Sequence, residues 1–534
     1  MATNLGRIIH HKENLYIFHK NPHRNEDIMF ASLSNLRRAA LATIAALCLV
    51  ISSACAGGTS SSSGSGGSTD IKIGLTAAPA NLDMTQTSGA AIPQALMYNV
   101  YESLVKLNTD GKTIEPLLAE DWSVSDDGLT YTFNLRKDVA FSNGDKFDAQ
   151  TVKFNLERLN SWTANTPSNL SAIDHVDVSS DYAAKVVLNK PDRNVLYWLA
   201  GPLGAMFDPN SVNSLKTKAI GTGPFLVKSY SVGSKMLLTR NAKYWGNKPF
   251  LENVQLTYYT DTTSCSNALL SGDIDTIYDF IAYDQLDQFK NNSNYSVRVG
   301  NAQGILVLSM NSQKGPFSNE KLRKAVMYAV NRKAIVDTVL NGYGTVLSAP
   351  TIPTDAWYSN VSSMYSFNQD KAKKLIKESG IDNPTIVFKV PSRSYAQSVS
   401  QLVKTQLEAV GFTVKLETEE FPAVWLKNTF NGKQYDMTVI NHVEPRSVFN
   451  YGNSEYYWNY TNTAVSSAFE QARKSSTDEA FNTAMGNAVK QIQEDAPADW
   501  IYNPKLVVVS KSDVSGINKN DVGISLELSN IKRS

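Results

Sequence analysis

With 534 residues, the chain is too long to fold around one hydrophobic core, so two or more lobes are expected. Its 51 Lys and Arg residues nearly balance its 50 Asp and Glu residues, and the net charge of +1 excludes the basic surface of a nucleic-acid-binding protein. Four of the six histidines fall within residues 1–28, which leaves only His175 and His442 and excludes a histidine-cluster metal site. No cofactor is expected, and the commonest hydrolase, metalloprotease and phosphate-loop motifs are absent.

A secretory signal is predicted near the start of the chain. Residues 1–28 are polar and precede Met29, where we expect translation to begin. Arg37 and Arg38 then lead into a thirteen-residue apolar run over 39–51, followed by small residues. This run is too short to cross a bilayer as a helix and is typical of a cleaved signal peptide.

The signal ends at Cys55, which makes it resemble a bacterial lipoprotein signal in which that thiol receives lipid. One position departs from the pattern, because Ser52 stands where such signals usually carry Leu. The resemblance implies a leader and signal peptide over 1–54 and a flexible Gly/Ser linker over 55–69. The protein is then anchored by lipid to the outer face of the cell membrane.

The first half of the mature chain contains clear strand and helix patterns. Residues 70–75 alternate as in a strand, and four-residue spacing of apolar side chains predicts a helix over 93–104. Alternation over 129–135 predicts another strand, and Asn143-Gly144 a turn. A helix capped by Asp148 is expected over 148–159. Cys265, the one cysteine after the signal, has no intramolecular disulfide partner and is expected to be buried.

In the second half, strands alternate with helices, which favours mixed α/β lobes. Strands are expected over 385–390 and 412–417, flanking an amphipathic helix over 394–410 that Gly411 ends. A long helix is expected over 319–340 and ends at Asn341-Gly342. Four basic residues are expected on its solvent-exposed face: Arg323, Lys324, Arg332 and Lys333.

Four phrases identify a family. They are 117–159, GTGPF at 221–225, RNAKYW at 240–245, and 311–344. Each resembles the corresponding stretch of the family 5 extracellular solute-binding proteins, the peptide-, nickel- and oligosaccharide-binding components of ABC importers. The phrases occur in the family's order, and the resemblance runs from Ile71 to the C-terminus.

The resemblance implies an α/β, two-lobed, periplasmic-binding-protein-like (type II) fold with an extra inserted domain. Its implied parts are a first lobe from 70–113, 219–304 and 500–534, an inserted domain at 114–218, and a second lobe at 305–499. Ligand is then held between the two main lobes by a monomer, which docks on ABC permease subunits and performs no chemistry itself.

Ligand-binding residues are carried over from one phrase of the peptide-binding members, in which an Asp pairs with the ligand's α-amine. Here Asn441 holds the Asp position and His442 the position after it, whereas Glu444-Pro445 matches. Because an unpaired buried ammonium is costly, a zwitterionic peptide needs another anion, and Glu444 is the nearest. Arg446 presents a planar fork suited to a carboxylate. The alternative is an ordinary ion pair between Glu444 and Arg446 that supports the loop.

Four further candidates complete the set, and the first three also have a structural alternative. Tyr457 and Trp458 belong to a dense aromatic group over 451–460 that either lines the cleft or packs the lobe. His442 is either a structural histidine or a pH-sensitive ligand contact. Glu102 matches a family position that faces the cleft.

Two other functions remain open as alternatives. The same scaffold binds a nickel chelate or an oligosaccharide in some members, although two histidines give poor direct metal coordination. A cell-surface hydrolase with a carboxylate pair is the remote alternative, because no spacing in the sequence marks such a pair.

Overall fold

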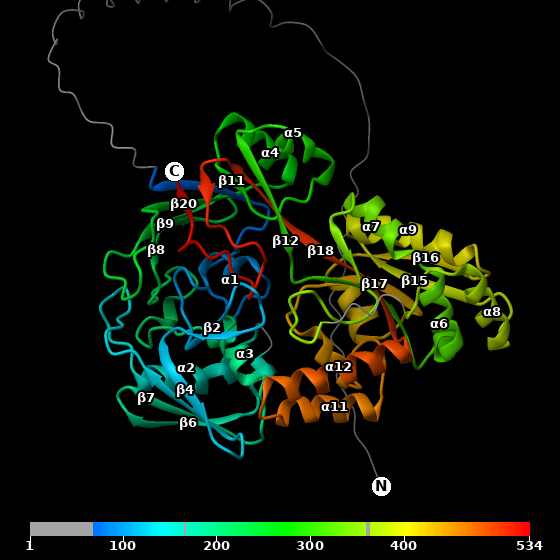
Figure 1. Cartoon of the computed structure of the whole chain (residues 1–534), viewed down its shortest axis with the longest axis horizontal. Coiled ribbons are helices and arrows are strands. Elements are labelled where there is room, and N and C mark those ends of the chain that lie inside the picture. Colours follow the sequence, from blue (N-terminus) through cyan, green and yellow to red (C-terminus); the bar gives the residue numbers. More distant parts are fainter. Residues whose placement is uncertain (1–67, 165–166, 359–363) are drawn as a thin grey trace, which may run out of the picture. The chain divides into compact units, whose positions relative to one another are not determined.

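The computed structural model describes residues 68–164, 167–358 and 364–534. The predicted leader, signal segment and lipidated Cys55, with most of the 55–69 linker, lie outside the described residues. Within the described part, helices and strands alternate around a mixed sheet of twelve strands, so the α/β prediction is confirmed (Figure 1). Among the helices of these residues, none combines the length and apolar character needed to cross a bilayer.

Ten strands of the large sheet form one path, and two more pair with its central strand. The order is β16 (Thr413–Glu419), β15 (Thr385–Pro391), β17 (Met437–His442), β13 (Ile305–Met310), β18 (Ala498–Lys511), β11 (Thr276–Ile277), β1 (Asp70–Leu75), β10 (Asn253–Tyr258), β9 (Lys235–Arg240) and β8 (Phe225–Ser231), with β12 (Tyr295–Asn301) and β14 (Gly344–Val346) on β18.

Strand β18 joins the two halves of this sheet. Its first residues pair antiparallel with β13, and its last residues pair antiparallel with β12. Only residues 302–304 separate β12 from β13. The buried Asn503 side chain donates hydrogen bonds of 2.7 Å to the carbonyls of both Ala302 and Gly304. The crossover between the two halves is therefore fixed to β18 by a buried side chain.

A separate antiparallel sheet follows the first strands. Its order is β4 (Ala119–Val124), β5 (Thr130–Leu135), β7 (Ala183–Leu188) and β6 (Ile173–Ser180). Helix α2 (Ala149–Glu157) packs against β6 and β7 and begins as predicted, because the Asp148 carboxylate accepts a hydrogen bond from the Thr151 amide at 3.1 Å. Figure 1 shows this sheet and helix in cyan and blue-green.

The predicted helix over 93–104 is wrong beyond Leu96. Helix α1 covers Ala91–Leu96, and Tyr98 has a positive φ of 61°. The backbone of the following turn bonds to another part of the chain, since the amides of Gly223 and Phe225 donate to the carbonyls of Val100 and Asn99. The apolar spacing reflects burial in the core, and these tertiary bonds replace the continuing helix.

The predicted helix over 319–340 is two helices. Helix α6 (Glu320–Ala329) ends before Asn331, whose side chain caps α7 (Arg332–Leu340) by accepting from the Ala334 amide. Because the chain changes direction between α6 and α7, the two helices bury different sides of the predicted helix. Two of the four basic residues are therefore buried, contrary to expectation. Arg332 is 5% exposed and pairs with the buried Asp499 at 2.6 Å, and Arg323 is 8% exposed and donates to the Phe317 and Asp495 carbonyls.

The remaining predicted elements are confirmed. The alternating strand at 70–75 is β1, and helix α9 (Ser394–Glu408) lies between the parallel strands β15 and β16. Cys265 is buried in α4 (Thr262–Ser271). Near the C-terminus, α11 (Thr463–Lys474) and α12 (Asp478–Asp495) pack against each other, as Figure 1 shows in orange.

Candidate ligand-binding site

The polar residues of the candidate phrase gather where β17 ends. Strand β17 pairs antiparallel with β13 and brings Asn441 opposite Leu306. His442 is its last residue, and Val443 beyond it is 50% exposed. The sequence Glu444-Pro445-Arg446 therefore continues from a buried strand into a surface loop, a common position for binding residues.

His442 is held in a hydrogen-bonded chain inside the protein. Its Nε2 lies 2.9 Å from the Tyr457 hydroxyl, which in turn lies 2.7 Å from the Ser309 hydroxyl. Its Nδ1 lies 3.2 Å from a carboxylate oxygen of Glu444. Only 5% of His442 is exposed, so the structural-histidine alternative accounts for its described contacts.

Glu444 is far more exposed than His442, because 58% of its side chain is accessible to solvent. Desolvation raises the pKa of Glu444, but the hydrogen bond with His442 and the backbone amide donors outweigh it and hold that pKa below its usual value. Its large exposure limits the desolvation further. The result is an ionised carboxylate at the end of β17 that faces outward.

Arg446 does not pair with Glu444. Its Nη1 donates to the Asn194 side chain, and its guanidinium lies 3.5 Å from the centroid of the Tyr197 ring. The rings of Trp357 and Phe481 lie within 5.2 and 5.3 Å of the same group. The Glu444 carboxylate is therefore hydrogen-bonded to His442, and the Glu444–Arg446 pair considered from the sequence is not formed.

The aromatic group around 451–460 is mainly lobe packing. Tyr457 and Trp458 are each 1% exposed, and Trp458 stacks on Tyr451 with ring centroids 4.0 Å apart. Neither ring face of this stack is open to a ligand. The indole Nε1 of Trp458 is nevertheless a buried donor without a partner among the described residues. Such a group calls for an additional hydrogen-bond acceptor.

Asn441 carries a second unpaired polar atom. Its amide N donates to the Tyr395 hydroxyl at 3.1 Å, whereas its side-chain Oδ1 is a buried acceptor with no partner in the described part of the chain. Gly304 of the β12–β13 crossover lies against this side chain, since a Cβ there would stand 2.9 Å from Oδ1. Asn441 is thus placed at the junction of the two halves of the sheet.

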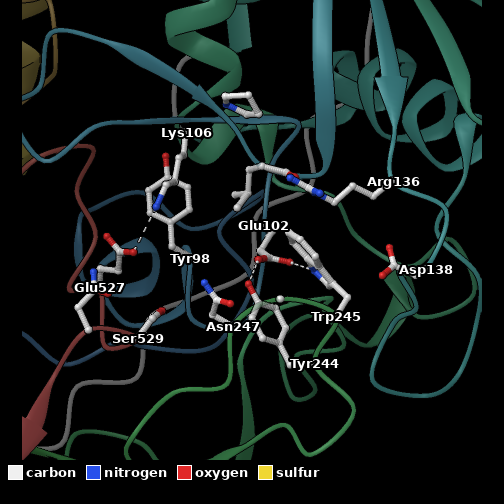
Figure 2. Close-up of a pocket in the computed structure, with 14 residues that line it drawn as sticks. Tyr98, Glu102, Lys106, Arg136, Asp138, Tyr244, Trp245, Asn247, Glu527 and Ser529 are labelled. Atoms are coloured by element: carbon white, nitrogen blue, oxygen red, sulfur yellow. Dashed lines mark hydrogen bonds and ion pairs between the residues drawn. The ribbon is translucent and has the colours of Figure 1, made fainter.

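Glu102 lies apart from these residues. Figure 2 shows its carboxylate on the wall of a pocket of about 560 Å³, and residues 439–460 contribute nothing to that pocket. The carboxylate accepts from the hydroxyls of Thr222 and Tyr244 at 2.8 Å and from the Trp245 indole at 2.9 Å. Burial raises the pKa of Glu102 to about 7, although these three donors lower it.

Figure 2 also shows why no cation neutralises Glu102. Lys106 reaches Glu527 at 3.5 Å instead, and Arg136 stacks on Trp245 with 4.8 Å between its guanidinium carbon and the ring centroid. The three donors come from GTGPF and RNAKYW, two of the phrases that carry the family resemblance. Glu102 therefore ties these loops together.

Sequence reasoning missed the segment around α3 (Val195–Leu199), which faces Arg446. Arg193, Tyr197, Arg446 and Phe481 all border a second pocket of about 430 Å³. Nothing in the local sequence of 192–197 marks this role, because its partners follow more than 250 residues later. Among the described residues, no group of three or more His, Cys, Asp or Glu side chains is arranged to hold a metal ion.

The two halves of the large sheet share β18, and together with the smaller antiparallel sheet they have the fold of type II periplasmic binding proteins. Solved structures with this fold match it closely. HbpA2 from Haemophilus parasuis superposes with a TM-score of 0.77 at 23% identity, covering 87% of this chain and 100% of that one. DppA from Helicobacter pylori, in complex with the peptide STSA, gives 0.74 at 24% identity, covering 87% and 98%.

The chain belongs to the bacterial extracellular solute-binding proteins, family 5, whose model (family 5 Middle) matches residues 113–464. The glutathione-binding protein GsiB of Salmonella paratyphi A is 29% identical over 339 residues, or 61% of this chain and 65% of the relative. The nickel-binding periplasmic protein of Escherichia coli is 28% identical over 365 residues, or 61% and 67%. The matched region thus spans about two thirds of the length of these curated relatives.

Proposed function

We propose that this protein is the lipid-anchored, extracytoplasmic substrate-binding component of an ABC importer, which captures peptides or similar small organic solutes by hinge closure and delivers them to a membrane permease. Membership of family 5 over residues 113–464 is the observation that carries this proposal. We propose the same two lobes and inserted domain, with the ranges given from the sequence, and a ligand held between the lobes. The crossover at 302–304 and β18 serve as the hinge.

The end of β17 supports a ligand with a positively charged group. Glu444 is ionised and more than half exposed, and Asn441 Oδ1 is a buried acceptor without a partner in the described part of the chain. An ionised carboxylate accepts strong hydrogen bonds from an ammonium group, so a peptide amine fits the exposed Glu444 side chain. A solute with a free α-amine is therefore the substrate class that we propose.

The same geometry argues against the two other family ligands at this place. Both nitrogens of His442 already have partners, so this ring has no free nitrogen for a nickel ion. The faces of Tyr457 and Trp458 are packed, so they offer no surface on which a sugar can stack.

A thermal-shift screen tests the substrate class. The full chain is heated with di- to pentapeptides, with N-acetylated versions of the same peptides, with nickel–histidine and with oligosaccharides. A ligand at 100 times its Kd stabilises the folded state by about 2.7 kcal/mol. We expect saturable stabilisation by free-amine peptides. Stabilisation by sugars or by the nickel complex alone, with none by any peptide, contradicts the peptide class.

A single substitution tests the amine contact. Glu444→Gln removes the negative charge, and we expect free-amine peptides to bind about 5-fold more weakly, since a half-exposed charge pair is worth about 1 kcal/mol. The N-acetylated peptide serves as the matched control, because it carries no ammonium group for Glu444 to bind. Equal losses for both peptides would show that Glu444 does not bind the amine.

The lipid anchor is tested on Cys55. Mass spectrometry of the N-terminal peptide from membrane fractions is expected to show an acylated cysteine, and Cys55→Ser is expected to release the protein from the membrane. An unmodified Cys55 in membrane-bound protein would exclude lipidation.

A further inference from the structure

Segments that lie 252 to 285 residues apart in the chain meet through two arginine side chains. Arg193, which precedes α3, donates from Nη1 to the Ser476 carbonyl at 2.9 Å and from Nη2 to the Asp478 carboxylate at 2.6 Å. Its backbone amide also donates to the Arg473 carbonyl at 2.9 Å. Three hydrogen bonds of one residue thus reach the turn between α11 and α12.

Arg446 makes the reverse contact. It lies in the loop after β17 and reaches back to Asn194 and to the face of Tyr197 in the α3 segment. Trp357 and Phe481 enclose the same guanidinium from the side of the second lobe. A cation held over an aromatic ring away from water is stabilised more strongly than an exposed pair.

These contacts join the proposed inserted domain to the proposed second lobe. We propose that Arg193 and Arg446 form a clamp that stabilises the closed form, and that the clamp thereby sets the affinity for every solute. The apparent Kd of a binding protein rises in proportion as its closed, competent fraction falls. The ligand part of this inference rests on the proposed function, whereas the closure part does not.

The clamp predicts a graded, ligand-independent loss. The Arg193–Asp478 pair is partly exposed, with 28% and 89% of the side chains accessible, so Asp478→Asn is expected to favour opening by about 3-fold. Tyr197→Leu removes the ring beneath Arg446 and is expected to favour opening by about 10-fold. Neither residue belongs to the group proposed to bind the solute.

Hydrogen exchange measures opening without any ligand, because the Arg193 amide is bonded to the Arg473 carbonyl across the clamp. We expect the Arg193 amide of the full chain to exchange about 3-fold faster in Asp478→Asn and about 10-fold faster in Tyr197→Leu. Asp478→Glu keeps the charge and is expected to exchange like the wild type. Lys490→Ala, on the same helix but paired only with Glu494, is the matched control. Unchanged exchange in both clamp variants overturns the proposal.

Affinity gives the second readout. For any two solutes bound by the wild type, the Kd is expected to rise by the same factor in a given clamp variant, mainly through faster dissociation. A loss confined to one solute overturns the clamp, because it indicates direct contact. If the wild type binds none of the peptides, sugars or nickel complexes, the proposed function fails. The hydrogen-exchange rates still show whether the Arg193 and Arg446 contacts stabilise the closed form.

Discussion

The carboxyl group of Glu102 offers a quantitative test of the free-energy cost of burying a charge in this protein. Glu102 is 1% exposed and receives three hydrogen bonds, but Lys106 and Arg136 are both engaged elsewhere. Its pKa is raised from the ordinary 4.5 to about 7, chiefly by burial. At 1.36 kcal/mol per pKa unit, keeping this group ionised costs about 3 kcal/mol of folding free energy.

The sign of the pH effect follows from the raised pKa. The folded protein binds the proton more tightly than the unfolded chain, so the stability contributed by protonated Glu102 is complete below pH 4.5. It declines as the pH rises and is lost above about pH 7. The Glu102→Gln variant does not titrate, so its stability lacks this component.

Urea denaturation of both proteins between about pH 4.5 and pH 8 measures the effect. We expect the unfolding free energy of the wild type, minus that of Glu102→Gln, to fall by about 3 kcal/mol over this range. Any constant effect of the amide cancels in the comparison. Glu120→Gln, which alters an exposed carboxylate on β4, is the control and is expected to show no such trend. A difference that stays constant with pH would refute the reasoning.

Five further substitutions make three tests of the packing, each by urea denaturation. Asp499→Ala leaves the buried Arg332 guanidinium without its carboxylate and is expected to cost about 3–5 kcal/mol, whereas Asp337→Ala, which removes the exposed partner of Lys333, should cost under about 0.5 kcal/mol. Gly221→Ala places a Cβ 1.9 Å from the Val100 carbonyl oxygen and should prevent correct folding. Gly486→Ala adds a Cβ in open space on α12 and should stabilise the protein by about 1 kcal/mol. Equal effects of the two substitutions would contradict the close backbone contact at Gly221. Tyr457→Phe deprives the buried His442 and Ser309 of their shared hydroxyl and should cost about 1–3 kcal/mol, and a neutral result would show that the chain of bonds is not stabilising.

Local patterns predicted much of the fold because they depend on neighbouring residues. The Asp148 cap and the alternation in β1 and β5 each arise within a few residues, and each is found as expected. The errors occur where distant backbone intervenes. The helix expected over 93–104 stops at Leu96 because the GTGPF loop takes its hydrogen bonds, and the helix expected over 319–340 is interrupted where Asn331 caps a new one.

The family, its α/β fold and the candidate phrase at the end of β17 were available from the order of motifs along the chain, because each motif is contiguous. The partners of those residues were not available. That Arg446 packs on Tyr197 and not against Glu444, and that Glu102 lies in a pocket away from Asn441, depends on which segments the shared strand β18 and the small inserted sheet bring together. Side-chain spacing along a chain specifies helices, strands and caps, whereas contacts between segments hundreds of residues apart are fixed only when the whole core packs.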